Sequence, residues 1–164
     1  MFAPLDQLPD DSRIWIYQAD RALSFAECGA LDEALSAFAQ RWAAHGAPVR
    51  AWAGVKDQHF LVFAADENYS GVSGCSIDSS VQMVREWGTR LGVDFFGRLT
   101  LACETPQGLK LLHRDALEAA EKSGLLGPET TVYDHTVQTL GQWRNTWKRP
   151  LRQSWAAGSL SLHG

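Results

Sequence analysis

Residues 13–28 read RIWIYQADRALSFAEC and join a predicted strand to a predicted helix. The first seven residues alternate and are rich in β-branched and aromatic side chains, which is typical of a strand. Ser24 is followed three residues later by Glu27, and this spacing predicts a capping box, in which each side chain bonds the backbone amide of the other residue. A helix is therefore expected to begin at Ser24.

The helical pattern that begins at Ser24 continues through Trp42. Its apolar residues recur every three or four positions and share one face: Cys28, Leu31, Leu35, Phe38 and Trp42. Gly46 and Pro48 follow and are typical of a helix end, because glycine tolerates the left-handed cap and proline lacks an amide hydrogen. This part of the chain therefore predicts a strand followed by a long amphipathic helix.

Further along, VRAWAGV (49–55) and HFLVFAA (59–65) are β-rich runs separated by KDQ, which predicts a hairpin whose second strand is buried on both faces. A second helical pattern (77–91) and a strand within DFFGRLTLACE (94–104) come next. The order strand, helix, strand, strand, helix, strand matches the ferredoxin-like arrangement βαββαβ. We therefore expect an α+β fold with an antiparallel-rich sheet and helices packed on one face.

The chain has 164 residues, of which 45% are hydrophobic and 21% charged, and this composition suits one globular domain that folds alone. Residues 1–12 are expected to be a loose N-terminus and residues 13–104 the core. Residues 105–164 are expected to be C-terminal additions, with a strand at LKLLH (109–113) and a last helix over 134–148, which Pro150 would end.

The net charge of −4 disfavours generic binding to nucleic acid or to an anionic membrane. This charge is uneven, because residues 135–164 hold four basic residues and no acidic one, whereas residues 1–134 carry −8. The first residues lack the basic start and apolar centre of a signal peptide, and no apolar run approaches the ~18 residues of a membrane span. We therefore expect a cytoplasmic protein, with no membrane association.

Residues 70–80 read SGVSGCSIDSS and lead from the hairpin into the second helix. A loop that enters a helix presents unpaired amides and the positive end of the helix dipole, and glycine lets a ligand approach the backbone. We expect six residues to bind a small anionic or polar ligand: Ser70, Ser73, Gly74, Ser76, Asp78 and Ser80. The phosphate motifs GxxxxGK[ST] and GxGxxG are absent, so no particular cofactor is indicated.

Cys75 lies at or just before the predicted start of the second helix, where the helix dipole lowers a thiol pKa and favours the nucleophilic thiolate. His59, on the strand that feeds the loop, is a candidate base for it. In the alternative interpretation, Ser76 or Asp78 caps the helix and Cys75 is a small buried side chain, so the residues leave open whether the chain is an enzyme. No metal site is predicted, since no HxH, HxxxH or HExxH spacing occurs.

The C-terminal segment LGQWRNTWKRPLRQSW (140–155) interleaves tryptophan with basic residues. Trp143 and Trp147 lie four residues apart, and Arg144 and Lys148 accompany them. One interpretation is an interaction module that binds a protein, RNA or a second copy of the chain, although nucleic acid is disfavoured by the net charge. The other is a helix that docks its tryptophans on the core and pairs its cations with acidic residues, which we favour.

Three motifs and a final dipeptide resemble an uncharacterised family of small bacterial proteins. The family pattern is SRxWIYQxxR, WxxHG, SGCSIDxSV and SW, matched here by residues 12–21, 42–46, 73–81 and 154–155. Members often bear the label "ABC transporter ATPase", but this chain has no Walker A loop, so ATP hydrolysis of that class is not expected. The resemblance implies no reaction, and it points to the same loop at residues 73–81.

Overall fold

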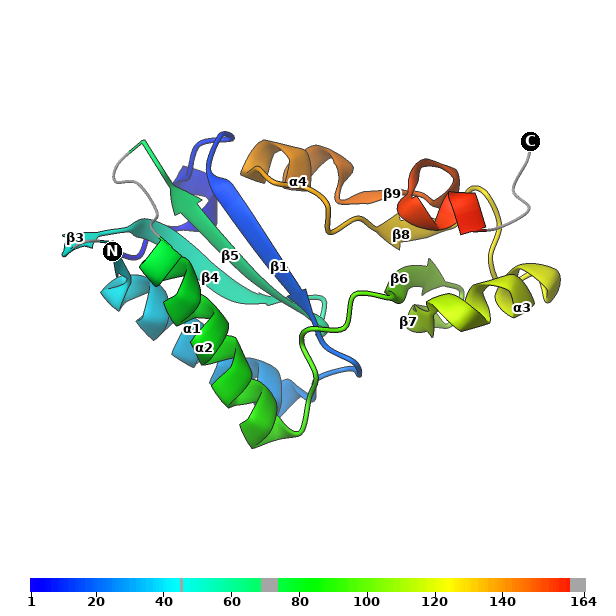
Figure 1. Cartoon of the computed structure of the whole chain (residues 1–164), viewed down its shortest axis with the longest axis horizontal. Coiled ribbons are helices and arrows are strands. Elements are labelled where there is room, and N and C mark those ends of the chain that lie inside the picture. Colours follow the sequence, from blue (N-terminus) through cyan, green and yellow to red (C-terminus); the bar gives the residue numbers. More distant parts are fainter. Residues whose placement is uncertain (45, 69–73, 160–164) are drawn as a thin grey trace. The chain divides into compact units, whose positions relative to one another are not determined.

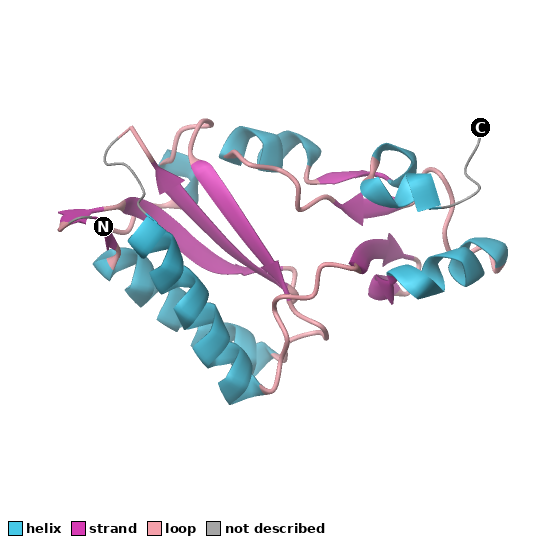
Figure 2. Ribbon diagram, in the orientation of Figure 1, coloured by secondary structure: helices cyan, strands magenta, loops and turns pink. Residues whose placement is uncertain are grey.

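The computed structural model describes residues 1–44, 46–68 and 74–159. The chain forms two compact units, residues 1–97 with 138–142 and residues 98–137 with 143–164. Both contain helix and antiparallel sheet (Figure 2), so the predicted α+β class is confirmed. The first unit ends at residue 97, whereas the sequence predicts a core that reaches residue 104.

The first unit contains a three-stranded antiparallel sheet in the order β1-β5-β4. Its strands are β1 (Arg13–Gln18), β4 (Arg50–Lys56) and β5 (Phe60–Asp66), and β4 and β5 form the predicted hairpin. Helices α1 (Phe25–Arg41) and α2 (Gly74–Leu91) lie side by side against one face of this sheet (Figure 1). The central strand β5 is buried along its whole length, as its unbroken apolar run predicts.

Short elements flank these strands and helices. A 3₁₀ turn, η1 (Leu5–Gln7), precedes β1, and β2 (Ala43–Ala44) pairs with β3 (Ala47–Pro48) after α1. The N-terminal segment, predicted to be loose, instead pairs with the outer edge of β4: the Ala3 amide donates to the Ala51 carbonyl at 2.8 Å. This pairing supplies edge amides and carbonyls of β4 with partners.

The ferredoxin-like expectation is wrong in its last strand. In that arrangement the final strand pairs with the outer edge of β1, but here β6 (Thr100–Thr105) belongs to the sheet of the second unit. The edge of β1 is met instead by Gln138, whose carbonyl accepts a hydrogen bond from the Ile14 amide at 3.1 Å. The segment that follows β6 returns after only two residues to pair with it, and such a local pairing closes a much shorter loop than a return to β1.

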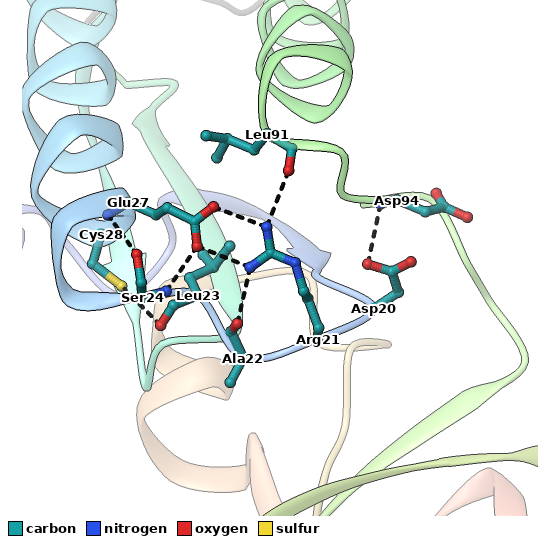
Figure 3. Close-up of polar contacts among 9 residues, drawn as sticks. All are labelled: Asp20, Arg21, Ala22, Leu23, Ser24, Glu27, Cys28, Leu91 and Asp94. Atoms are coloured by element: carbon teal, nitrogen blue, oxygen red, sulfur yellow. Dashed lines mark hydrogen bonds and ion pairs between the residues drawn. The ribbon is translucent and has the colours of Figure 1, made fainter.

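The start of α1 is fixed by the capping box that the sequence predicts (Figure 3). Ser24 Oγ accepts from the Glu27 amide at 3.1 Å, and Glu27 Oε1 accepts from the Ser24 amide at 2.8 Å. Arg21 pairs with both oxygens of Glu27 at 2.8 Å and donates to the Leu91 carbonyl, at the end of α2, at 3.0 Å. Arg21 and the Ser24 amide together hold the pKa of Glu27 at about 2. One guanidinium therefore joins the first turn of α1 to the last turn of α2, and the two helices run antiparallel.

The second unit contains a four-stranded antiparallel sheet in the order β7-β6-β8-β9. Its remaining strands are β7 (Gly108–His113), β8 (Thr131–Tyr133) and β9 (Lys148–Pro150), and β7 confirms the predicted strand at LKLLH. The helical elements are η2 (Arg114–Ala116), α3 (Leu117–Lys122), α4 (Leu140–Thr146), η3 (Leu151–Gln153) and η4 (Trp155–Ser159).

Of the single helix predicted over residues 134–148, only Leu140–Thr146 is helical, because residues 138–139 run beside the start of β1 and Lys148–Pro150 pairs with β8 as a strand. Apolar residues from both ends of the unit fill one core: Leu101, Cys103, Leu117, Leu126, Val132, Leu151 and Ala156. The C-terminal segment is thus part of the core of this unit.

Candidate functional site

The predicted ligand-binding residues surround the entrance of α2. Ser70 and Ser73 lie outside the described residues, as does the side chain of Cys75, which occupies the first turn of α2. Gly74 and Asp78 are exposed, whereas Ser76 and Ser80 are buried. The buried serines therefore hold the helix in place, and the exposed surface of the entrance comes from Gly74 and Asp78.

Ser76 connects the entrance of α2 to the end of α1. Its carbonyl accepts a hydrogen bond from the indole Nε1 of Trp42 at 2.8 Å and another from Ser79 Oγ at 3.2 Å. Trp42 is only 3% exposed, and its ring packs against Trp15 and Phe63 with centroid distances of 5.8 and 6.2 Å. The tryptophan that ends α1 thereby positions the first turn of α2 over the sheet.

Ser80 makes a second connection, to β1. Its hydroxyl donates to the Ile77 carbonyl at 2.6 Å and also bonds with Tyr17. Burial raises the pKa of Tyr17 above its usual value of 10, and the bond with Ser80 opposes that rise. Three motifs that are far apart in the sequence, around Tyr17, Trp42 and Ser80, are therefore joined through the first two turns of α2.

His59 lies in the turn before β5, whereas α2 follows β5. Its Nδ1 lies 2.9 Å from the Asp57 carbonyl within the turn between β4 and β5. The side chain of Cys75 lies outside the described residues, so the pairing of His59 with Cys75 as base and nucleophile stays a prediction.

A depression of about 480 Å³ opens in the first unit where β1 begins and β5 ends. Its lining comes from three separate segments: Asp11, Arg13, Ile14 and Trp15, then Glu67, and then Gln138 and Thr139. It lies near the first turn of α2, because its Trp15 packs against Trp42, whose indole bonds to the Ser76 carbonyl. Arg13 and Trp15 point to the same face of β1, since side chains alternate along a strand.

The charged groups of the depression are one guanidinium and two carboxylates. Arg13 lies over the ring of Trp15, with Cζ 5.0 Å from the centroid, and Nη1 is 3.6 Å from Glu67 Oε1. Both Arg13 and Glu67 keep 44% of their side-chain surface exposed. The side-chain nitrogen Nδ2 of Asn68 donates to both carboxylate oxygens of Asp11, at 3.0 and 2.9 Å. The depression therefore offers an accessible cation and an accessible anion beside an aromatic ring.

These lining residues are not among the binding residues predicted from the sequence, which all lie in the serine-rich segment. A signal was present: Arg13, Trp15 and Tyr17 alternate in the predicted strand, which places an arginine and two aromatic rings on one face. Asp11, Glu67 and Thr139 carried no such signal, because their proximity arises from the pairing of β1 with β5 and with residues 138–139.

The C-terminal segment docks within the second unit, as the favoured interpretation expects. Trp147 is 5% exposed and stacks on Trp143 with a centroid distance of 5.2 Å. Three of its cations form ion pairs: Lys148 with Glu104 at 3.2 Å, Arg149 with Asp134 at 3.2 Å and Arg152 with Glu129 at 2.7 Å. Trp155 remains 42% exposed.

Among the described residues, no three His, Cys, Asp or Glu side chains are grouped so that they could hold a metal ion. Cys28 and Cys103 are free thiols, and burial is the main cause that raises the pKa of each. No helix in the described part of the chain combines the length and apolar character needed to cross a membrane.

Comparisons of the chain with protein-family models, with curated proteins and with solved structures found no match. The resemblance to the SGCSIDxSV family stays a prediction.

Proposed function

We propose that the chain binds a small zwitterion, such as a free amino acid, in the depression beside the entrance of α2. The observation that carries this proposal is the lining of the depression, where Arg13 faces the same opening as Asp11 and Glu67, beside Trp15. A volume of about 480 Å³ lies within the roughly 300–1,000 Å³ of small-molecule sites.

The charge of the lining supports a zwitterion over a simple anion. Arg13 can bind a carboxylate through two parallel hydrogen bonds, which is the strongest geometry for that pair. Asp11 and Glu67 would repel an isolated phosphate, but they favour a ligand that also carries an ammonium group. This refines the expected ligand from anionic or polar to a molecule with both charges.

Of the ligand-binding residues predicted from the sequence, Gly74 and Asp78 belong to this proposal, because they are exposed at the entrance of α2. Reactivity of Cys75 remains a separate prediction. It is tested by the pH dependence of alkylation at Cys75, with Cys28 and Cys103 as internal references because burial raises the pKa of both. Rapid alkylation of Cys75 alone below pH ~8.5 supports thiol chemistry, and a silent Cys75 leaves binding as the function.

The binding proposal is tested by calorimetric titration of the full chain with each of the common amino acids and with inorganic phosphate. Arg13→Gln is expected to weaken binding of the best amino acid by about 10- to 100-fold, because a charge-assisted pair is lost. Arg98→Gln is the matched control, since Arg98 is exposed and remote in sequence from the lining. Equal affinities of the two variants, or binding of phosphate alone, would reject the proposal.

The alternative of an interaction module at the C-terminal segment has less support. Lys148, Arg149 and Arg152 are already paired with carboxylates, and Trp147 is buried. RNA binding there would weaken steeply with added salt, and an RNA titration at two salt concentrations tests it. A cytoplasmic location remains a prediction from the sequence.

A further inference from the structure

The outer strands of the two larger sheets differ in how their edges are protected. An exposed strand edge presents a row of unpaired N–H and C=O groups that can pair with another chain, and proteins normally cover or blunt it. The edge of β4 pairs with residues 1–3, and the edge of β1 with Gln138 and Thr139. The edge strand β9 is short and contains Lys148, Arg149 and Pro150, all of which discourage pairing.

β7 is the edge strand without such protection. It is six residues long, reads GLKLLH, and contains three leucines, one lysine and no proline. Its leucines are half-buried, so apolar surface accompanies the open backbone. Residues of this strand bond to β6 on one side only.

The pairing register identifies which groups of β7 point outward. The Arg114 amide donates to the Leu99 carbonyl at 2.7 Å, which makes Leu99 and Arg114 a hydrogen-bonded pair. Such pairs recur at every second position of an antiparallel ladder, so the β7 residues bonded to β6 are 108, 110 and 112. The N–H and C=O groups of Leu109 and Leu111 and the N–H of His113 therefore point away from β6, and they bond to no other residue in the described part of the chain. The His113 carbonyl is the N-cap carbonyl of η2 and accepts the first bond of that turn.

We propose that β7 pairs with β7 of a second copy of the chain, antiparallel and about a two-fold axis through Leu111. This arrangement pairs Leu109 with the partner's His113 and Leu111 with the partner's Leu111. All three outward positions of each copy then match outward positions of the other, and because the His113 carbonyls are bonded within η2, this gives about four hydrogen bonds. The result is one continuous sheet in which β7 and its copy are the two central strands.

The side chains fit the same symmetry. Leu111 lies beside the partner's Leu111 on one face of the sheet, where apolar cross-strand pairs stabilise a ladder. On the other face each Lys110 lies beside the partner's Leu112, so the two lysines are not directly opposite. A second copy therefore provides partners for the outward backbone groups and apolar neighbours for the leucines. It places no two lysines directly opposite each other.

The test is sedimentation equilibrium of the full chain from about 1 μM to about 1 mM, a span that covers weak and moderate dimers. Leu111→Pro removes an outward amide and leaves the bonds to β6 intact, as proline on an edge strand does. Loss of two of the four hydrogen bonds, one from each copy, is expected to weaken association about 30-fold or more. Leu111→Ala is the matched control, because it shortens the same side chain but keeps the amide.

A dimer that survives in Leu111→Ala and dissociates in Leu111→Pro supports the proposal. A monomer at every concentration, or equal association of the two variants, overturns it. Should Leu111→Pro fail to fold, hydrogen exchange of the wild-type chain decides the matter. The amides of Leu111 and His113 are expected to exchange slowly at high concentration and fast at low concentration, and fast exchange at both concentrations overturns the proposal.

Discussion

Replacement of Trp42 by phenylalanine tests whether this residue positions the entrance of α2. The indole bond to the Ser76 carbonyl contributes about 1 kcal/mol net to the free energy of unfolding. Phenylalanine buries roughly 50 Å² less than tryptophan, which costs about another 1 kcal/mol at ~25 cal/mol per Å². Weaker ring contacts with Trp15 and Phe63 add about 0.5 kcal/mol. The expected loss is therefore about 2.5 kcal/mol.

Urea unfolding followed by circular dichroism measures this loss. For a slope of about 2 kcal/mol per molar urea, the midpoint is expected to fall by about 1 M. Trp52→Phe is the control, because Trp52 is half-buried on β4 and its indole N–H makes no hydrogen bond within the described ranges. A loss below about 0.5 kcal/mol in Trp42→Phe, or a loss equal to that of Trp52→Phe, would refute the anchoring role.

Three further predictions concern pH and packing. The carboxyl of Glu27 is expected to titrate near pH 2 by NMR, and titration near 4.5 would contradict this. Its pairing with Arg21 therefore stabilises the fold fully above about pH 4.5, and this stabilisation is lost as the pH falls through 2. Burial lowers the pKa of His135 from 6.5 to about 4, so the free energy of unfolding is expected to fall as the pH drops from 6.5 to 4. Urea titrations are expected to show a loss of at most about 3 kcal/mol, and a smaller loss in His135→Gln. Gly88→Ala would place Cβ 2.7 Å from the Val93 carbonyl and is expected to cost about 1–3 kcal/mol, whereas Gly97→Ala, with open space, is expected to be neutral; equal thermal stabilities would contradict the packing argument.

The local signals in the sequence predicted the first unit well. Ser24 and Glu27 defined the start of α1 because capping depends on residues only three positions apart. The hairpin of β4 and β5 followed from two adjacent β-rich runs. Sheet membership of β6 was not predictable, because its partner is chosen by competition between β7 and the edge of β1, and local patterns do not reveal which pairing wins.

Only part of the candidate site could be predicted from the sequence. The serine-rich segment leads into α2, whose first turn bonds to Trp42. The depression itself depends on residues 11–15, Glu67 and Thr139, which are distant in the sequence and become neighbours only through strand pairing. The role of His59 beside Cys75 stays a prediction, because the described residues do not include the Cys75 side chain.

The zwitterion site is the central claim, and NMR mapping tests it most directly. A ¹H–¹⁵N spectrum of the full chain is recorded while the common amino acids are added one at a time. We predict saturable shifts of the amides of Ile14, Trp15, Glu67 and Thr139 with at least one amino acid, and their loss in Arg13→Gln. Saturable shifts confined to other parts of the chain, or no shift with any amino acid at about 10 mM, would contradict the claim.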